Sequence, residues 1–157
     1  MARFLAMLLV LCSACSPPAT SASLSFRLAC TENASPPSGV GRDYPFWAGS
    51  RSHGPETHLC LSEKEFLGSA AVKSAEASIT NRLPEATITI RLTSEAADQL
   101  ASVTRNNRLR RMAVLLDGQI ILAATIVNPI EGGVIEVRGY GYEASQEIAK
   151  RINQAVK

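Results

Sequence analysis

Cysteine is the residue type in this chain best suited to covalent chemistry. Cys30 ends the alternating run 24–30, Cys60 lies in the apolar run 59–61, and neither has a second cysteine at C-x-x-C spacing. Isolated cysteines make poor zinc sites, whereas an even number in an oxidising compartment indicates a disulfide. A closed ring of about 30 residues would stabilise the fold by roughly 3–4 kcal/mol. We therefore predict a Cys30–Cys60 disulfide between adjacent strands, facing the core.

Histidines and catalytic motifs give no comparable signal. His53 and His58 have an H-x4-H spacing, but no third ligand stands near them, and exposed loop histidines are common. The chain contains no G-x-S-x-G, H-E-x-x-H, phosphate-binding or dinucleotide-binding motif in a suitable setting. We expect no enzyme activity, no cofactor and no metal.

The first residues have the features of an export signal. Arg3 supplies a positive charge, residues 4–11 are apolar, and small residues then lead to Cys15. The pattern resembles the bacterial lipobox, which implies cleavage after residue 14 and lipidation of Cys15. The alternative is ordinary secretion with cleavage near Ala22. In the first case, the Pro- and Ser-rich segment 15–23 is a flexible tether to a membrane.

An insertion at about 31–58 contains a cluster of aromatic residues. It is rich in Gly, Pro and Ser and too long for a routine connection, so we expect it to be irregular. Tyr44, Phe46 and the only tryptophan, Trp47, lie within it. They could fold back over one end of a sheet, or a loop closed by the disulfide could present them to a partner.

Positive charge is concentrated where the first predicted helix ends and the next strand begins. The four arginines are Arg105, Arg108, Arg110 and Arg111. Side chains of this kind at a helix C-terminus cap its carbonyl groups and interact favourably with its dipole. Contact with anionic lipid headgroups or with a negatively charged protein is the second interpretation.

These candidates must be positioned by strands and helices that the pattern also predicts. Residues 86–92 alternate apolar and polar side chains, as a strand with one buried face requires. Residues 93–107 repeat apolar positions at helical spacing behind the capping residue Thr93 or Ser94. Residues 144–156 repeat them every fourth position and form a closing helix.

Between the two helices the sequence predicts a hairpin and one more strand. Asp117 and Gly118 separate the apolar runs 112–116 and 120–127, and this dipeptide accepts the positive φ angles of a tight turn. A further strand is expected at 134–137. We predict one α+β domain over 24–157, with a single antiparallel or mixed β-sheet and two main helices packed on one face.

Short motifs in the same region occur in an order typical of one family. They are LT-x-E-A from Leu92, T-R-x-N from Thr104, R-x-A-V-x-L-D-G from Arg111, P-I-x-G-G from Pro129 and G-x-G-Y-E-A from Gly139. This series resembles the head of the first periplasmic domain of SecD, a membrane subunit of the bacterial protein-export apparatus, and weaker similarity covers 59–79. The resemblance implies the head fold and polypeptide binding. Proton transport does not carry over, because the one strongly apolar run, 4–11, is shorter than the ~20 residues that span a bilayer.

Together these patterns predict a non-enzymatic lipoprotein on the periplasmic side of the bacterial cell envelope. Its expected partners are unfolded polypeptide or envelope proteins, including export-machinery subunits, and a membrane through the lipid anchor. The alternative is a structural or inhibitory interaction module that uses the same fold for an unrelated envelope partner. Nucleic acid is excluded as a partner because the net charge is only +2.

Overall fold

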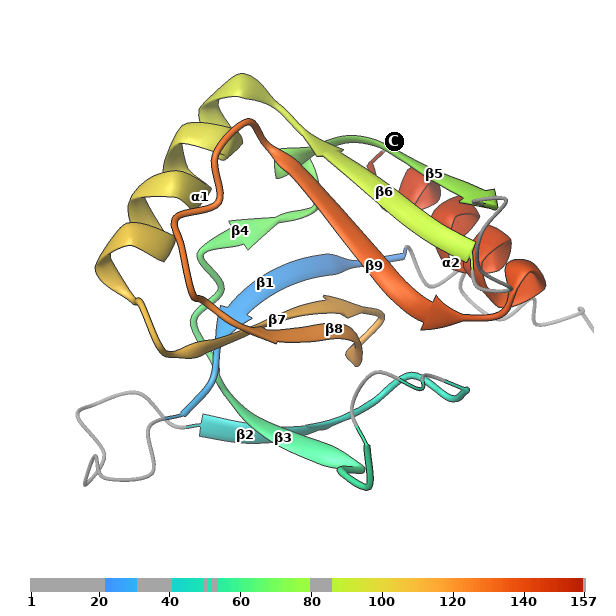
Figure 1. Ribbon diagram of the computed structural model, residues 1–157, viewed down its shortest axis with the longest axis horizontal. Coiled ribbons are helices and arrows are strands. Elements are labelled where there is room, and N and C mark those ends of the chain that lie inside the picture. Colours follow the sequence, from blue (N-terminus) through green and yellow to red (C-terminus); the bar gives the residue numbers. More distant parts are fainter. Residues whose placement is uncertain (1–21, 31–40, 50, 52–53, 80–85, 157) are drawn as a thin grey trace, which may run out of the picture.

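Most of the secondary structure belongs to three antiparallel sheets (Figure 1). The structure is a computed structural model that describes residues 22–30, 41–49, 51, 54–79 and 86–156. Within these residues, one sheet has the order β4 (Leu67–Gly68), β1 (Leu24–Leu28), β7 (Arg111–Leu116) and β8 (Gln119–Thr125). A second has the order β5 (Val72–Ile79), β6 (Ala86–Leu92) and β9 (Val134–Tyr140). The third sheet is the hairpin of β2 (Gly41–Pro45) and β3 (His58–Ser62). The helices of the described residues are α1 (Ser94–Asn106), α2 (Tyr142–Ala155) and the short 3₁₀ helix η1 (Ser69–Ala71).

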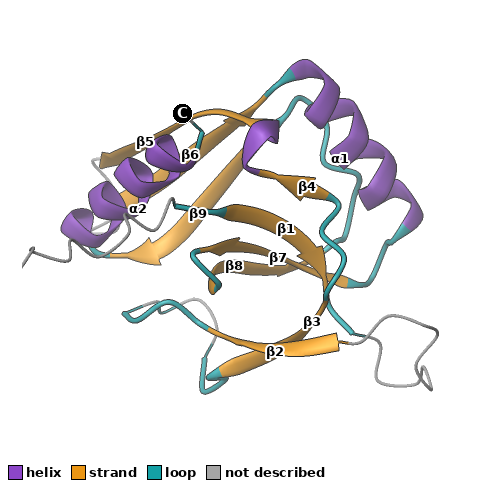
Figure 2. Cartoon of the chain, turned by 180° about the vertical axis from the view of Figure 1, so that it is seen from behind, coloured by secondary structure: helices purple, strands orange, loops and turns teal. Residues whose placement is uncertain are grey.

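The predicted α+β class is confirmed, but the prediction of a single sheet is wrong. β6 pairs with β5 and β9, whereas β7 pairs with β1 and β8, and α1 carries the chain from one sheet to the other. The sheets divide because each has an apolar face, and one core buries both faces together with the two helices. In Figures 1 and 2, α2 lies against β5 and β6 and α1 lies at the opposite side of the molecule, so the two helices do not share a single sheet face.

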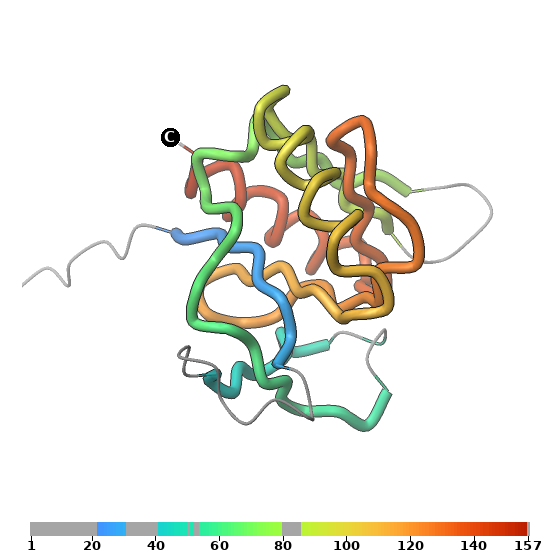
Figure 3. The backbone as a smooth tube through the Cα atoms, turned by 90° about the vertical axis from the view of Figure 1, so that its left-hand side faces the viewer, coloured from blue at the N-terminus to red at the C-terminus, as the bar shows by residue number. Residues whose placement is uncertain are grey.

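The apolar run that begins β7 is buried on both sides. Met112 and Val114 belong to the main core, while Ala113 and Leu115 belong to a second cluster with Ala29, Leu61 and Ile120. The β2–β3 hairpin covers this second face and runs along the bottom of the tube in Figure 3. A strand covered on both faces needs a continuous apolar sequence rather than an alternating one.

Several junctions confirm the local predictions. β6 has the predicted bounds, and the side chain of Thr93 accepts a hydrogen bond from the amide of Ala96 at 3.3 Å as the cap of α1. Asp117 and Gly118 have φ angles of 52° and 76°, which the tight β7–β8 hairpin requires. The predicted strand at 134–137 is the first part of β9.

The predicted Cys30–Cys60 disulfide is confirmed, with an S–S distance of 2.03 Å. It joins the end of β1 to β3 as expected, since the amide of Cys30 donates to the carbonyl of Cys60 at 3.0 Å. Cys30 is exposed and Cys60 half-buried, so the bond lies at the surface and does not face the core. The backbone of Gly41 passes over both sulfur atoms. The insertion is also more regular than predicted, because it contains β2 paired with β3 over five residues.

Candidate functional site

The three aromatic residues of the insertion contact the body of the domain. The Tyr44 ring is flanked by the guanidinium groups of Arg27 and Arg42, at 5.5 and 5.8 Å from its centre. Phe46 packs on the second core cluster, beside Ile120. The amide of Trp47 donates to the carbonyl of Ile120 at 2.9 Å. Each of the three aromatic side chains is half-buried, so each keeps a partly accessible face.

Trp47 also has a cationic neighbour from α2 that sequence reasoning missed. The guanidinium of Arg151 lies 5.5 Å from the centre of the Trp47 ring and forms an ion pair with Asp117 at 3.2 Å. Asp117 in turn accepts a hydrogen bond from the amide of Ser23 at 2.9 Å. One arginine therefore links the insertion, the β7–β8 turn and the start of β1. No spacing in the sequence could have indicated a contact between positions 47 and 151.

The four arginines predicted as a cluster each bond to different residues. Arg105 pairs with Glu131 at 3.5 Å, and the Nε of Arg108 donates to the carbonyl of Val127 at 3.3 Å. Arg110 bonds the side chain of Asn107 at 2.9 Å and the carbonyl of Ala29 at 3.0 Å. Arg111 makes a two-pronged contact with Glu56, at 3.0 and 2.8 Å. These bonds direct the charges along the protein surface rather than toward a common point.

The pairing with Glu56 has an electrostatic consequence. Its hydrogen bond and, to a smaller degree, its negative charge raise the pKa of Arg111, against the opposing effect of burial. The contact ties the insertion, which contains Glu56, to the first residue of β7. Arg111 is thus part of the attachment of the β2–β3 hairpin to the domain.

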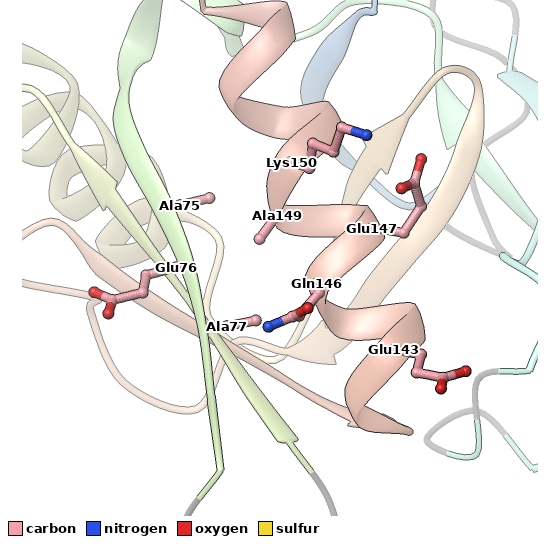
Figure 4. Close-up of a pocket in the computed structure, with 8 residues that line it drawn as sticks. All are labelled: Ala75, Glu76, Ala77, Glu143, Gln146, Glu147, Ala149 and Lys150. Atoms are coloured by element: carbon pink, nitrogen blue, oxygen red, sulfur yellow. The ribbon is translucent and has the colours of Figure 1, made fainter.

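A groove between β5 and α2 is the feature that sequence reasoning did not find. It has a volume of about 560 Å³, and Figure 4 shows Ala75, Ala77, Ala149 and Gln146 between the strand and the helix. Four charged residues complete its lining: Glu76, Glu143, Glu147 and Lys150. In Figure 4 their side chains point away from the space between strand and helix, so they form a rim around a floor of small residues.

One end of this groove is closed by a side chain that imitates a neighbouring strand. The amide of Ala75 donates to Asn153 Oδ1 at 2.9 Å, and Asn153 Nδ2 donates to the carbonyl of Ala75 at 2.8 Å. Asn153 belongs to α2, and β5 is an edge strand of its sheet. An exposed edge attracts further strands, and proteins commonly cover such edges. Among the described residues, the cover extends over Ala75 alone.

The described residues contain neither a cluster of potential metal ligands nor a helix long and apolar enough to span a membrane. No three His, Cys, Asp or Glu side chains gather there in a way that could hold a metal ion. His58 Nδ1 lies 3.1 Å from the hydroxyl of Thr57, and His53 falls outside the described residues. None of the helices in this part of the chain is long and apolar enough to cross a bilayer.

Comparison with known structures places this arrangement of sheets among SecDF proteins. The chain aligns with "Structure and function of a membrane component SecDF that enhances protein export" at a TM-score of 0.62 and 23% identity, covering 85% of this chain and 63% of that one. It aligns with SecDF from Thermus thermophilus, described as a translocon-associated membrane protein, at a TM-score of 0.53 and 22% identity, covering 87% of this chain and 20% of the other. At these identities the similarity concerns the fold.

Sequence comparison identifies the same part of the molecule. The protein translocase subunit SecD of Rickettsia bellii is 29% identical over 93 residues, which are 59% of this chain and 18% of the relative. The chain therefore spans under a fifth of the length of that relative. The family model for the P1 head subdomain of SecDF matches residues 47–155, well over half of the chain. This protein belongs to the SecDF P1 head family.

Proposed function

We propose that this protein is a non-enzymatic component of the bacterial cell envelope that binds polypeptide and assists protein export or envelope assembly. The observation that carries the proposal is the family match over 47–155, which includes both the β5–α2 groove and the aromatic residue Trp47. One similar structure is described as a membrane component that enhances protein export. A domain shared with such a protein supports a related role on the periplasmic side.

The proposal includes a lipid anchor at Cys15. The sequence from Arg3 to Cys15 supports it, and this segment lies outside the described residues. A tether from 15 to 23 reaches at most roughly 30 Å when fully extended, at about 3.3–3.6 Å per residue. The amide and carbonyl of Ser23 are bonded to Asp117, so the domain begins immediately where the tether ends. An anchor of this length would hold the domain close to the membrane surface and raise its local concentration there.

Two sets of residues named from the sequence remain candidate contact surfaces under this proposal. The accessible faces of Tyr44, Phe46 and Trp47 offer aromatic area on a hairpin that is fixed by the disulfide and by Arg111. Of the arginines, Arg105 and Arg108 are exposed while Arg110 and Arg111 are half-buried. The exposed pair is therefore the better candidate for contact with an anionic protein or lipid headgroups.

In-cell crosslinking from the native envelope, followed by affinity purification, tests the proposal. Wild type is compared with a Phe46→Ala/Trp47→Ala variant, and with Val127→Ala as a control that removes an exposed apolar side chain elsewhere. Circular dichroism checks that each variant is folded. Recovery of translocase subunits or many exported clients supports the proposal. One stoichiometric folded partner would favour the alternative of an unrelated interaction module, and recovery of no polypeptide would contradict the proposed function.

A further inference from the structure

The hydrogen-bonding pattern of β5 leaves part of its edge open. β5 pairs with β6 in antiparallel register, with Ala75 opposite Ile90 and Ala77 opposite Ile88. In such a pair the backbone groups of alternate residues point away from the partner strand. Ala75 points its amide and carbonyl outward, to Asn153, so Ala77 and Ile79 must point theirs outward as well. Among the described residues, none hydrogen-bonds to the outward groups of Ala77 or Ile79.

The open edge and α2 face each other across the groove. Ile79 is opposite Ala86, which is opposite Tyr140, two residues before α2 begins. The exposed end of β5 and the first turn of α2 therefore lie at the same end of the groove. Asn153 closes the other end. A chain segment entering the groove would meet unpaired backbone groups on one side and the helix on the other.

The small residues of the floor determine what could fit. Ala75, Ala77 and Ala149 occupy positions where larger side chains would fill the space between strand and helix. An extended segment with small side chains facing this floor could approach the strand closely enough to form backbone hydrogen bonds. Strand addition at a sheet edge is a recurring mode of peptide recognition, in which the backbone gives affinity and alternate side chains give specificity.

The charge of the rim selects among such segments. Glu76, Glu143 and Glu147 outnumber Lys150, and none of the four has an ion-pair partner among the described residues. Successive side chains of a strand point to opposite faces, so a segment with small side chains on the floor directs its alternate side chains to the face on which Glu76 lies. A cationic side chain there would lie beside the Glu76 carboxylate. The rim is therefore complementary to a basic segment.

We propose that β5 binds an extended, basic segment of unfolded polypeptide as an added strand, lying between β5 and α2 and ending at Asn153. This inference rests on the proposed function and deepens it by naming the site and the class of partner. A second copy of this chain is a poorer occupant. Pairing β5 with its own copy would bring Glu76 close to its equivalent, and opposed like charges destabilise strand pairs.

The test uses fluorescence anisotropy with the purified full-length protein and three labelled ten-residue peptides. The first alternates Lys with Ala and Val, the second carries Glu in place of Lys, and the third has the side chains of the first but N-methyl groups on alternate backbone nitrogens. We expect the Glu peptide and the methylated peptide to bind at least fivefold more weakly than the first. Equal affinities for all three would contradict strand addition.

Two pairs of variants locate the site. Ala77→Pro removes the outward N–H without removing a bond to β6, and Ala77→Ser keeps it as the matched control. Glu76→Gln removes the carboxylate on the face that the cationic side chains of the segment would share, and Glu63→Gln removes an exposed charge outside the groove. We expect at least a fivefold loss of affinity for the basic peptide with the first member of each pair and no loss with the second.

The outcomes separate this inference from the proposed function. If wild type binds the basic peptide and neither Ala77→Pro nor Glu76→Gln weakens binding, the site is elsewhere and only the inference fails. If wild type binds no unfolded peptide, the proposed function fails with it. Analytical ultracentrifugation tests whether a second copy of the chain binds at the β5 edge. A dimer that Ala77→Pro abolishes would show that it does and would overturn the inference.

Discussion

The side-chain amide of Asn153 bonds both backbone groups of Ala75, accepting from its nitrogen at 2.9 Å and donating to its oxygen at 2.8 Å. A carboxamide carries the same kinds of C=O and N–H groups as a peptide, so α2 supplies the acceptor and the donor that one residue of a neighbouring strand would supply. This contact shows that such groups are accommodated beside Ala75 of β5. It also defines the point at which the covered part of the edge ends and the open part begins.

Replacing Asn153 tests the structural value of this contact. Asn153→Ala removes two hydrogen bonds to a backbone that is largely shielded from water, and each is worth about 1 kcal/mol net. We expect the free energy of unfolding in urea to fall by about 1–3 kcal/mol. Gln154→Ala, an exposed change at the next position of α2, is the control and should have little effect. Equal stabilities for the two variants would show that the contact does not support the fold.

The disulfide should carry a measurable share of the stability. Cys30→Ser/Cys60→Ser opens a ring with a sequence separation of 30 residues. On the chain-entropy model the free energy of unfolding then falls by roughly 3–4 kcal/mol. Chemical denaturation of the variant, and of wild type with and without reductant, measures the difference. Superimposable curves would mean that β2 and β3 are held as firmly by their other contacts.

Gly41 should be required for this disulfide. A Cβ atom at position 41 would lie 2.7 Å from the sulfur of Cys60 and closer still to that of Cys30, so the bond or the strand must move. We expect Gly41→Ala to destabilise the protein by about 1–3 kcal/mol, the usual cost of overpacking, and to increase the reactivity of free thiols. Gly141→Ala is a matched control, because nothing lies within 4 Å of its added Cβ. A Gly41→Ala protein with wild-type stability and no free thiol would refute the expectation.

The Arg111–Glu56 pair should add little stability and show no pH dependence near neutrality. The raised pKa of Arg111 means that the arginine's contribution is fully present below its unfolded pKa and is lost only as pH rises through the higher folded pKa, far above neutrality. The side chains are 33% and 44% exposed, so solvent screening limits the coupling to about 0.5–1 kcal/mol. A double-mutant cycle with Arg111→Gln and Glu56→Gln measures it. Coupling above 2 kcal/mol, or coupling that salt does not reduce, would contradict this view.

Local sequence patterns predicted the parts of the fold that local physics decides. The bounds of β6, the Thr93 cap and the Asp117–Gly118 turn depend on neighbouring residues, so alternation, capping chemistry and turn propensity were sufficient. The division into sheets was missed because it depends on which distant strands pair, as with β1 and β7. β2 was missed because its sequence, GRDYP, lacks apolar alternation and is stabilised by β3 and the second core cluster.

The candidate site was less accessible to sequence reasoning than the fold. The arginines lie within seven residues of one another in sequence, but their long side chains reach partners as distant as Ala29 and Glu56. The β5–α2 groove joins positions 75–77 to positions 143–150, and Asn153 is 78 residues from Ala75. No periodicity within a single element carries this information. Only the tertiary structure places an open strand edge beside an acidic helix rim.

Amide hydrogen exchange, measured by NMR on the full-length protein with and without the basic peptide, tests the central claim most directly. The amides of Ala77 and Ile79 point away from β6 and should exchange quickly in the free protein, while that of Ser78 should already be slow because it faces β6. We predict that the peptide slows exchange at Ala77 and Ile79 at least fivefold. A peptide that binds while both amides continue to exchange at the free rate would contradict strand addition at β5.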